Sequence, residues 1–212
     1  MTITALETNL YQRLTPFFAD HGYTLLTGKK QFRRISTSGF QNVILSSVFG
    51  PDTLLAVNFG CRHEHIEQIA QQFLNNPSHL WADANTLLVS TGRFSGSPSF
   101  RYTIHSEAEL PDVCDQIERF FDRRGFDFLS TDSTLAQLDQ LLNEFPDQPC
   151  PYVYNQTHRC YKGLIAARLN HNPRFDSLID QYRQLLVRQT QDPYEQLYFE
   201  RLIAYLHHYS AN

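Results

Sequence analysis

Residues 22–73 alternate short apolar runs with turns and then change to helical spacing, and this order constrains the fold more than any other feature of the chain. The short runs span residues 23–27, 31–36, 41–49 and 54–60. In the last run Leu55, Val57 and Phe59 share one face, because successive side chains of a strand point to opposite faces. The block therefore predicts an antiparallel meander of four strands.

Further helices and strands follow from the same spacing rules. We expect helices over residues 1–20, 66–74 and 110–121, and two more strands over residues 86–91 and 99–106. The loop between those two strands is polar and longer than a tight hairpin needs. The third helix is expected to end before Arg124-Gly125.

From Thr131 onward every apolar run has helical spacing, and strand signals are missing. The sequence thus predicts an α+β fold, with an antiparallel sheet of about six strands, helices on one of its faces and a C-terminal helical bundle. We assign residues 1–130 to an α+β sheet domain. Residues 131–212 are expected to form a helical extension that packs on the first part.

Composition and charge narrow the classes of partner and compartment. Hydrophobic residues make up 42% of the 212 residues, which suffices for a sizeable core. The formal net charge of −4 gives no long-range attraction to a polyphosphate, so we expect no nucleic-acid partner. No run approaches about 18 uncharged apolar residues and no secretory signal is evident, which predicts no membrane association and a cytoplasmic location. The four scattered cysteines are expected to be reduced thiols.

Two groups of potential metal ligands lack the spacing of a metal site. His63 and His65 straddle a strand-to-helix junction, with no third ligand at helical spacing nearby. Cys150 and Cys160 flank His158, but nine residues separate the two cysteines, whereas structural zinc sites use closely spaced pairs. We expect no metal ion.

Motifs for covalent or phosphate chemistry are also missing. The segment 92–97 places Ser95 between glycines, but it lacks the strand, turn and helix that surround a nucleophile elbow. No glycine pattern follows a strand and opens a helix in the manner of a dinucleotide or P-loop motif. We therefore expect no catalytic residue and no cofactor.

The basic turn, defined as Lys29, Lys30, Arg33 and Arg34, places four cationic side chains within six residues. Charged residues on a hairpin can simply form a solvated edge that blocks aggregation. The other interpretation is that these side chains bind an anion or an acidic partner. Both interpretations remain open on the sequence.

A polar groove on the sheet is the second binding hypothesis. Strand parity puts Arg101 and His105 on the face opposite Tyr102. If that face is open, Arg33, Asn58, Arg101 and His105 share a shallow groove. Of these residues, His105 is the plausible acid or base near neutral pH.

The C-terminal helices are rich in tyrosine, and they form the third hypothesis. Tyrosine is enriched at protein interfaces because its ring buries area while its hydroxyl stays hydrogen-bonded. We expect Tyr198 and Tyr205 to belong to such an interface.

Four short segments of the chain carry a family resemblance. They are KKQFRR at 29–34, GFQNVIL at 39–45, VNFG at 57–60 and KGLIAA at 162–167. In these segments the chain resembles a group of uncharacterised bacterial proteins that are catalogued as a domain of unknown function. The resemblance implies a bacterial cytosolic α+β protein, and some look-alikes are suspected immunity or antitoxin proteins.

Two functions from different classes follow. The leading prediction is non-catalytic binding of a protein partner, which includes self-association and an immunity-like role. The alternative is an enzyme that binds a small molecule or an anion on the open sheet face, using Arg33, Arg101 and His105. A deep pocket lined by those residues would favour the enzyme, whereas a flat exposed apolar patch would favour the partner.

Overall fold

A computed structural model describes residues 5–50, 52–131, 134–190 and 192–209. The first four residues of the predicted helix at 1–20 therefore lie outside the described residues. The chain divides into two compact units. The sheet unit consists of Met1–Cys61 and Leu88–Thr131, and the helical unit consists of Arg62–Leu87 and Asp132–Asn212. Residues 62–87 thus group with the C-terminal helices, and the division into domains at residues 1–130 and 131–212 stays a prediction.

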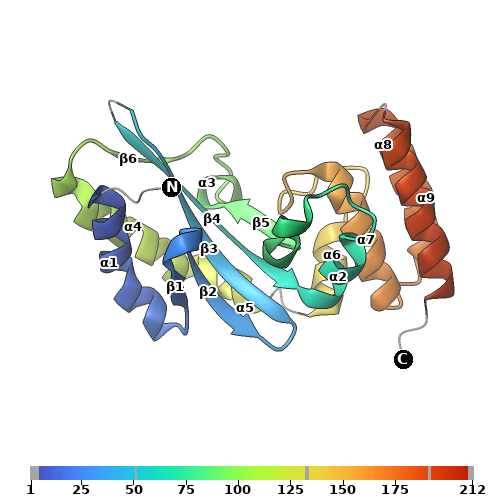
Figure 1. Cartoon of the computed structure of the whole chain (residues 1–212), viewed down its shortest axis with the longest axis horizontal. Coiled ribbons are helices and arrows are strands. Elements are labelled where there is room, and N and C mark those ends of the chain that lie inside the picture. Colours follow the sequence, from blue (N-terminus) through green and yellow to red (C-terminus); the bar gives the residue numbers. More distant parts are fainter. Residues whose placement is uncertain (1–4, 51, 132–133, 191, 210–212) are drawn as a thin grey trace. The chain divides into compact units, whose positions relative to one another are not determined.

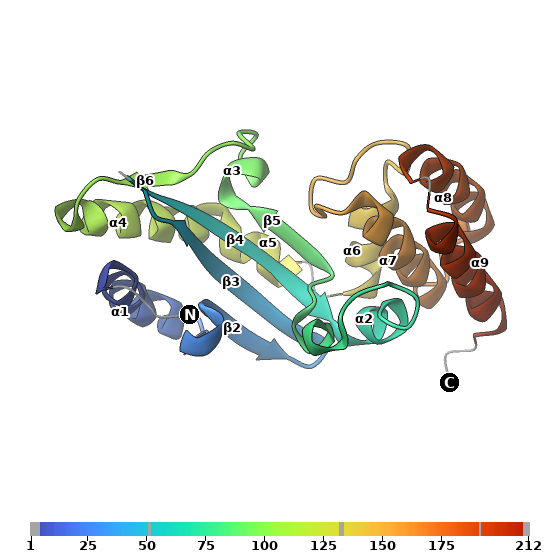
Figure 2. The same cartoon turned by 45° about the horizontal axis from the view of Figure 1, so that its top comes forward.

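The sheet has six strands (Figures 1 and 2). They are β1 (Thr24–Leu26), β2 (Gln31–Ser36), β3 (Gly39–Val48), β4 (Thr53–His63), β5 (Leu87–Ser90) and β6 (Tyr102–Ile104). Strands β1 to β5 are adjacent in chain order, and β6 pairs antiparallel with residues 53–55 of β4. Because β5 and β6 both pair with β4, the segment 91–101 between them must leave the sheet. The predicted antiparallel sheet of about six strands is confirmed.

One face of the sheet unit is buried by helices. These are α1 (Ala5–Asp20), α4 (Leu110–Phe120) and α5 (Phe126–Thr131), with the four-residue helix α3 (Thr91–Phe94) after β5. Phe18 of α1 stacks on Phe32 of β2 at 4.5 Å between ring centroids. Phe59 of β4 meets Phe121 edge-on at 5.5 Å. Aromatic side chains therefore join the helices to the sheet, as their share of the composition suggests.

The third predicted helix does not end before Arg124-Gly125. It continues through a π-helical turn, η4 (Phe121–Gly125), directly into α5. Gly125 does not stop the helix; its missing side chain makes room for a ring. A methyl group at residue 125 would lie 2.5 Å from Cδ1 of Phe121, which is fully buried. The glycine is therefore required by packing rather than by termination.

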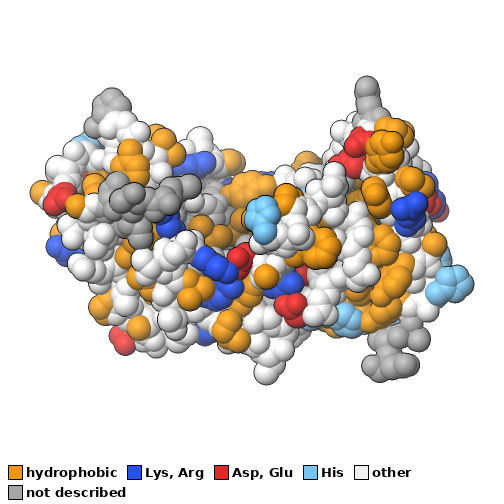
Figure 3. All heavy atoms as spheres, viewed as in Figure 1, with side chains coloured by type: hydrophobic (Ala, Val, Ile, Leu, Met, Phe, Trp, Pro, Cys, Tyr) orange, Lys and Arg blue, Asp and Glu red, His pale blue; other side chains and the backbone are white. Residues whose placement is uncertain are grey.

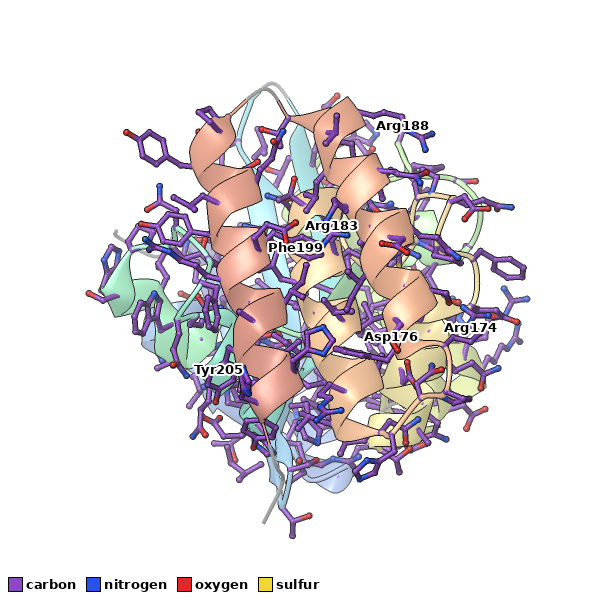
Figure 4. All side chains as sticks on the ribbon, turned by 90° about the vertical axis from the view of Figure 1, so that its right-hand side faces the viewer. Arg174, Asp176, Arg183, Arg188, Phe199 and Tyr205 are labelled. Atoms are coloured by element: carbon purple, nitrogen blue, oxygen red, sulfur yellow. The ribbon has the colours of Figure 1, made fainter. Side chains whose placement is uncertain are left out.

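The helical unit is built around α7 (Gln156–Leu169), most of whose residues are buried. Its other elements are α2 (Glu64–Ala70), η2 (Ser78–Asp83), α6 (Leu135–Asn143), α8 (Phe175–Gln189) and α9 (Pro193–His208). The side chain of Asn155 caps α7 by accepting a hydrogen bond from the backbone N–H of His158. Figure 4 shows α8 and α9 side by side. None of the helices in the described part of the chain combines the length and apolar content of a membrane span.

A buried ion pair links α2 to α7 inside the helical unit. Glu67 is fully buried and Lys162 is 5% exposed, and Lys162 Nζ lies 2.9 Å from Glu67 Oε1. Thr86 and Gln71 also donate hydrogen bonds to the Glu67 carboxylate. Burial alone would raise the pKa of Glu67, but Lys162 and these two donors together hold it below its usual value. The carboxylate is therefore charged, and both of its oxygens accept hydrogen bonds.

Candidate anion-binding site

A pocket lies entirely within the sheet unit, beside the segment that leaves the sheet between β5 and β6. Its volume is about 550 Å³. One wall consists of Thr91, Gly92, Ser95, Ser97, Phe100 and Tyr102, and the other consists of Gln116, Arg119, Phe120, Arg123 and Arg124. We call it the arginine pocket.

The first wall is shaped by a tight turn after β5. Ser90 caps α3 by accepting a hydrogen bond from the backbone N–H of Arg93. The backbone N–H of Ser97 then donates to the carbonyl of Gly92 at 2.8 Å. A methyl group at residue 92 would lie 2.6 Å from the Ser97 carbonyl oxygen and 2.8 Å from Cβ of Phe100. Only glycine allows the loop to fold back so closely.

Aromatic rings form the apolar part of the pocket. Tyr102 is buried, and its side chain is hydrogen-bonded to Thr91. Burial raises the pKa of Tyr102, so its hydroxyl stays protonated near neutral pH. Phe100 packs edge-on against Tyr102 at 4.9 Å between centroids, while 43% of its surface stays exposed. An exposed ring thus lies at the edge of the pocket.

The second wall is a helical stripe that the π turn extends. Gln116, Arg119 and Arg123 are spaced by three and four residues, which places them on one face of a helix. In a regular α-helix, Arg124 would lie well away from Arg119. In a π turn, however, hydrogen bonds join residues i and i+5. Two residues that are five positions apart therefore lie about one turn apart on the same side of the helix. The π turn therefore adds a third arginine to the stripe.

The charge of the pocket is positive. None of its lining residues is an Asp or a Glu. Arg119 donates from Nε to the carbonyl of Asp115 at 2.9 Å, and within the described residues none of the three lining arginines is within 4.0 Å of a carboxylate. Such a cluster of arginines offers paired N–H donors to an anion.

The basic turn does not gather its four side chains into one site. Lys30 donates to the carboxylate of buried Glu7 at 2.8 Å. Arg33 and Arg34 point to opposite faces of β2, as strand parity requires. Arg33 stacks over the ring of Phe40 at 3.7 Å, and Arg34 donates from Nε to Gln41 at 3.0 Å. Lys29 is exposed on the 3₁₀ turn before β2.

The polar groove residues lie on different parts of the sheet. Arg33 is opposite Asn42 on β3, and half-buried Asn58 is on β4. Arg101 precedes β6 and donates to the carbonyls of Pro98 and Phe100. Within β6, Tyr102 and Ile104 are buried and Thr103 is exposed, which is the alternation expected of a strand.

His105 follows β6 and forms an exposed pair with Asp52 at 2.8 Å. The hydrogen bond that His105 donates to Asp52, and then the charges of Asp52 and Glu109, raise the pKa of His105. The lining of the arginine pocket includes none of Arg33, Arg101 and His105.

The tyrosines of the predicted interface are both accessible on α9. Tyr198 is 36% exposed, and half-buried Tyr205 packs against Phe73. Val187, Tyr194 and Leu197 are exposed as well, and Figure 3 shows hydrophobic side chains over this part of the helical unit. The protein-partner hypothesis stays a prediction, and its self-association form is tested by sedimentation velocity over a range of protein concentrations.

The histidines and cysteines that the sequence offers as potential metal ligands make other contacts or lie apart from one another. His65 is hydrogen-bonded to Tyr209, and all four cysteines are buried thiols. The Cys160 thiol donates to the carbonyl of Gln156, and burial raises its pKa to about 12. Within the described residues, no three His, Cys, Asp or Glu side chains come together as metal ligands.

His158 makes the stability of the helical unit sensitive to acid. Burial, and then the charge of Lys162, lower its pKa to about 4. An unfolded histidine binds a proton near pH 6.5, so between about pH 6.5 and 4 the unfolded state binds more protons and stability falls as the pH falls. After allowance for its partial exposure, we expect His158 to account for about 1–2 kcal/mol of lost unfolding free energy between pH 7.5 and 5.

Urea unfolding followed by Trp81 fluorescence checks this prediction, because the only tryptophan of the chain lies in the helical unit. A His158→Gln variant should lose less stability than the wild type over that pH range. The exposed residue His79 provides the control replacement, His79→Gln. Equal acid sensitivity of the wild type and the His158 variant would refute the assignment.

No family model, curated protein or solved structure matches this chain.

Sequence reasoning missed the arginines of the pocket, although part of the signal was present. Gln116, Arg119 and Arg123 already show a polar stripe at helical spacing. The contribution of Arg124 could not be found in this way, because a π turn has no reliable sequence signature and the glycine after it resembles a helix end.

Proposed function

We propose that this protein binds a small organic anion in the arginine pocket and does not convert it chemically. The observation that carries the proposal is the presence of Arg119, Arg123 and Arg124 in one pocket whose lining contains no carboxylate. Guanidinium groups hold carboxylates and phosphates by paired, charge-assisted hydrogen bonds. The volume of about 550 Å³ falls within the range of small-molecule sites.

Binding without conversion is supported by the other lining residues. Thr91, Ser95 and Ser97 supply hydroxyl groups, but a hydroxyl nucleophile needs a base within hydrogen-bonding distance. The lining of the pocket holds no His, Lys, Asp or Glu side chain that could act as that base. Its polar groups are suited to holding a ligand in place.

Isothermal titration of benzoate, phenyl phosphate and inorganic phosphate at low ionic strength tests the proposal. We expect at least one of the two organic anions to bind the wild-type protein. Replacement of Arg123 by Gln should weaken that binding about tenfold, and the double variant Arg119→Gln, Arg123→Gln about 100-fold, because each removes a charge-assisted contact.

The matched control is Arg188→Gln, which removes the same charge from an exposed residue near the end of α8 (Figure 4). It should bind as the wild type does. The proposal fails if neither organic anion binds, or if the control and the pocket variants lose affinity equally.

A further inference from the structure

The three arginines carry more positive charge than a single carboxylate can balance. They lie within six residues of one another, along about one turn of helix. The acidic residues of α4 and of the π turn, Asp112, Asp115, Glu118 and Asp122, are absent from the pocket lining. A carboxylate ligand would balance one of the three charges, whereas a phosphate monoester carries about −1.5 to −2 at neutral pH.

The donors opposite the arginines also suit a tetrahedral anion. Ser95 and Ser97 are exposed on the facing wall, and Gln116 stands on the arginine side. A phosphate monoester presents three strong acceptor oxygens, which can be reached from more than one side. A planar carboxylate presents two oxygens, which one guanidinium group can already occupy.

The pocket is larger than a bare phosphate requires, and its remaining surface is aromatic. Phe100 is 43% exposed. Two contacts position its side chain and leave the exposed part of the ring accessible to a ligand. Its Cβ atom lies against Gly92, and its ring meets the edge of Tyr102. Aromatic rings favour offset-stacked or edge-to-face contacts with other rings.

Resting on the proposed function, we infer that the ligand of the arginine pocket is a phosphate monoester of an aromatic alcohol. The phosphate group binds Arg119, Arg123 and Arg124, and the ring of the ligand packs on Phe100. The phosphate group and the aromatic ring of the ligand can be tested separately.

Isothermal titration with phenyl phosphate, benzoate and inorganic phosphate at pH 7.5 separates the two ends. Phenyl phosphate should bind about tenfold more tightly than benzoate, because the dianion engages more of the arginines. It should also bind about tenfold more tightly than inorganic phosphate, because the ring adds an aromatic contact.

A Phe100→Ala variant tests the ring contact without disturbing the turn, since alanine retains the Cβ atom that lies against Gly92. Its affinity for phenyl phosphate should fall to that for inorganic phosphate, and the latter should be unchanged. Phe145→Ala, which truncates another exposed phenylalanine in the helical unit, should have no effect.

The outcomes distinguish this inference from the function on which it rests. Benzoate binding as tightly as phenyl phosphate would overturn the phosphate assignment and leave anion binding intact. Inorganic phosphate binding as tightly as phenyl phosphate, or a Phe100→Ala variant that binds normally, would overturn the aromatic assignment. Absence of binding by both organic anions would overturn the inference and the proposed function together.

Discussion

Replacement of Lys162 by methionine is expected to lower the unfolding free energy of the helical unit by about 3–5 kcal/mol. The substitution keeps most of the side-chain volume but leaves the carboxylate of Glu67 fully buried without its cation. Gln71 and Thr86 still donate to that carboxylate, but two neutral donors do not replace an ammonium group. The cost arises from the unpaired charge rather than from a cavity.

Urea titration monitored by Trp81 fluorescence measures this loss in the helical unit. The double variant Glu67→Gln, Lys162→Met should regain much of the stability, because it removes the buried negative charge that the single variant leaves without a cation. Lys29→Met provides the control, since Lys29 is exposed and belongs to the sheet unit. A double variant that is as unstable as the single one would show that the ion pair is not the source of the effect.

Replacement of Gly125 by alanine is expected to destabilise the sheet unit by about 1–3 kcal/mol and to weaken ligand binding as well. The added methyl group would lie 2.5 Å from a ring carbon of Phe121, so the ring or the π turn must shift. Phe121 is fully buried against Phe18 and Phe59, which leaves the ring little room. A shift of the turn would move Arg123 and Arg124.

Far-UV circular dichroism in urea reports the loss of stability, and Trp81 fluorescence in the same samples reports the helical unit. Titration with phenyl phosphate under folding conditions then measures the functional effect. At the exposed residue Gly28, a methyl group would meet no atom within 4 Å, so Gly28→Ala is the matched control. Unchanged stability and unchanged binding in Gly125→Ala would disprove the role assigned to the π turn.

Local rules predicted the elements of the fold where neighbouring residues determine them. The strand predicted over residues 31–36 has those bounds in the structure, because alternation and the flanking turns fix it from within. The helix predicted over residues 1–20 is described as Ala5–Asp20. Strand β6, by contrast, covers only Tyr102–Ile104 of the expected 99–106, since its length depends on pairing with distant residues of β4.

The candidate site could be predicted only in part, because it depends on contacts between distant segments. Adjacent arginines such as Arg33 and Arg34 suggest a patch in the sequence, yet a strand sends them to opposite faces. Arg119 and Arg124 are five positions apart and come to one side only because the helix widens between them. Phe100 reaches the same pocket because Gly92 lets its loop fold back.

The division of the chain into two units also determines the order in which the parts of each unit are synthesised. The segment Arg62–Leu87 is made before the sheet unit is complete, whereas the rest of the helical unit follows from Asp132. Lys162 leaves the ribosome about 95 residues after Glu67, which at about 5–20 residues per second is a delay of roughly 5–20 s. During that interval Glu67 stays hydrated, because α7, which carries the cation that pairs with it, has not yet been synthesised.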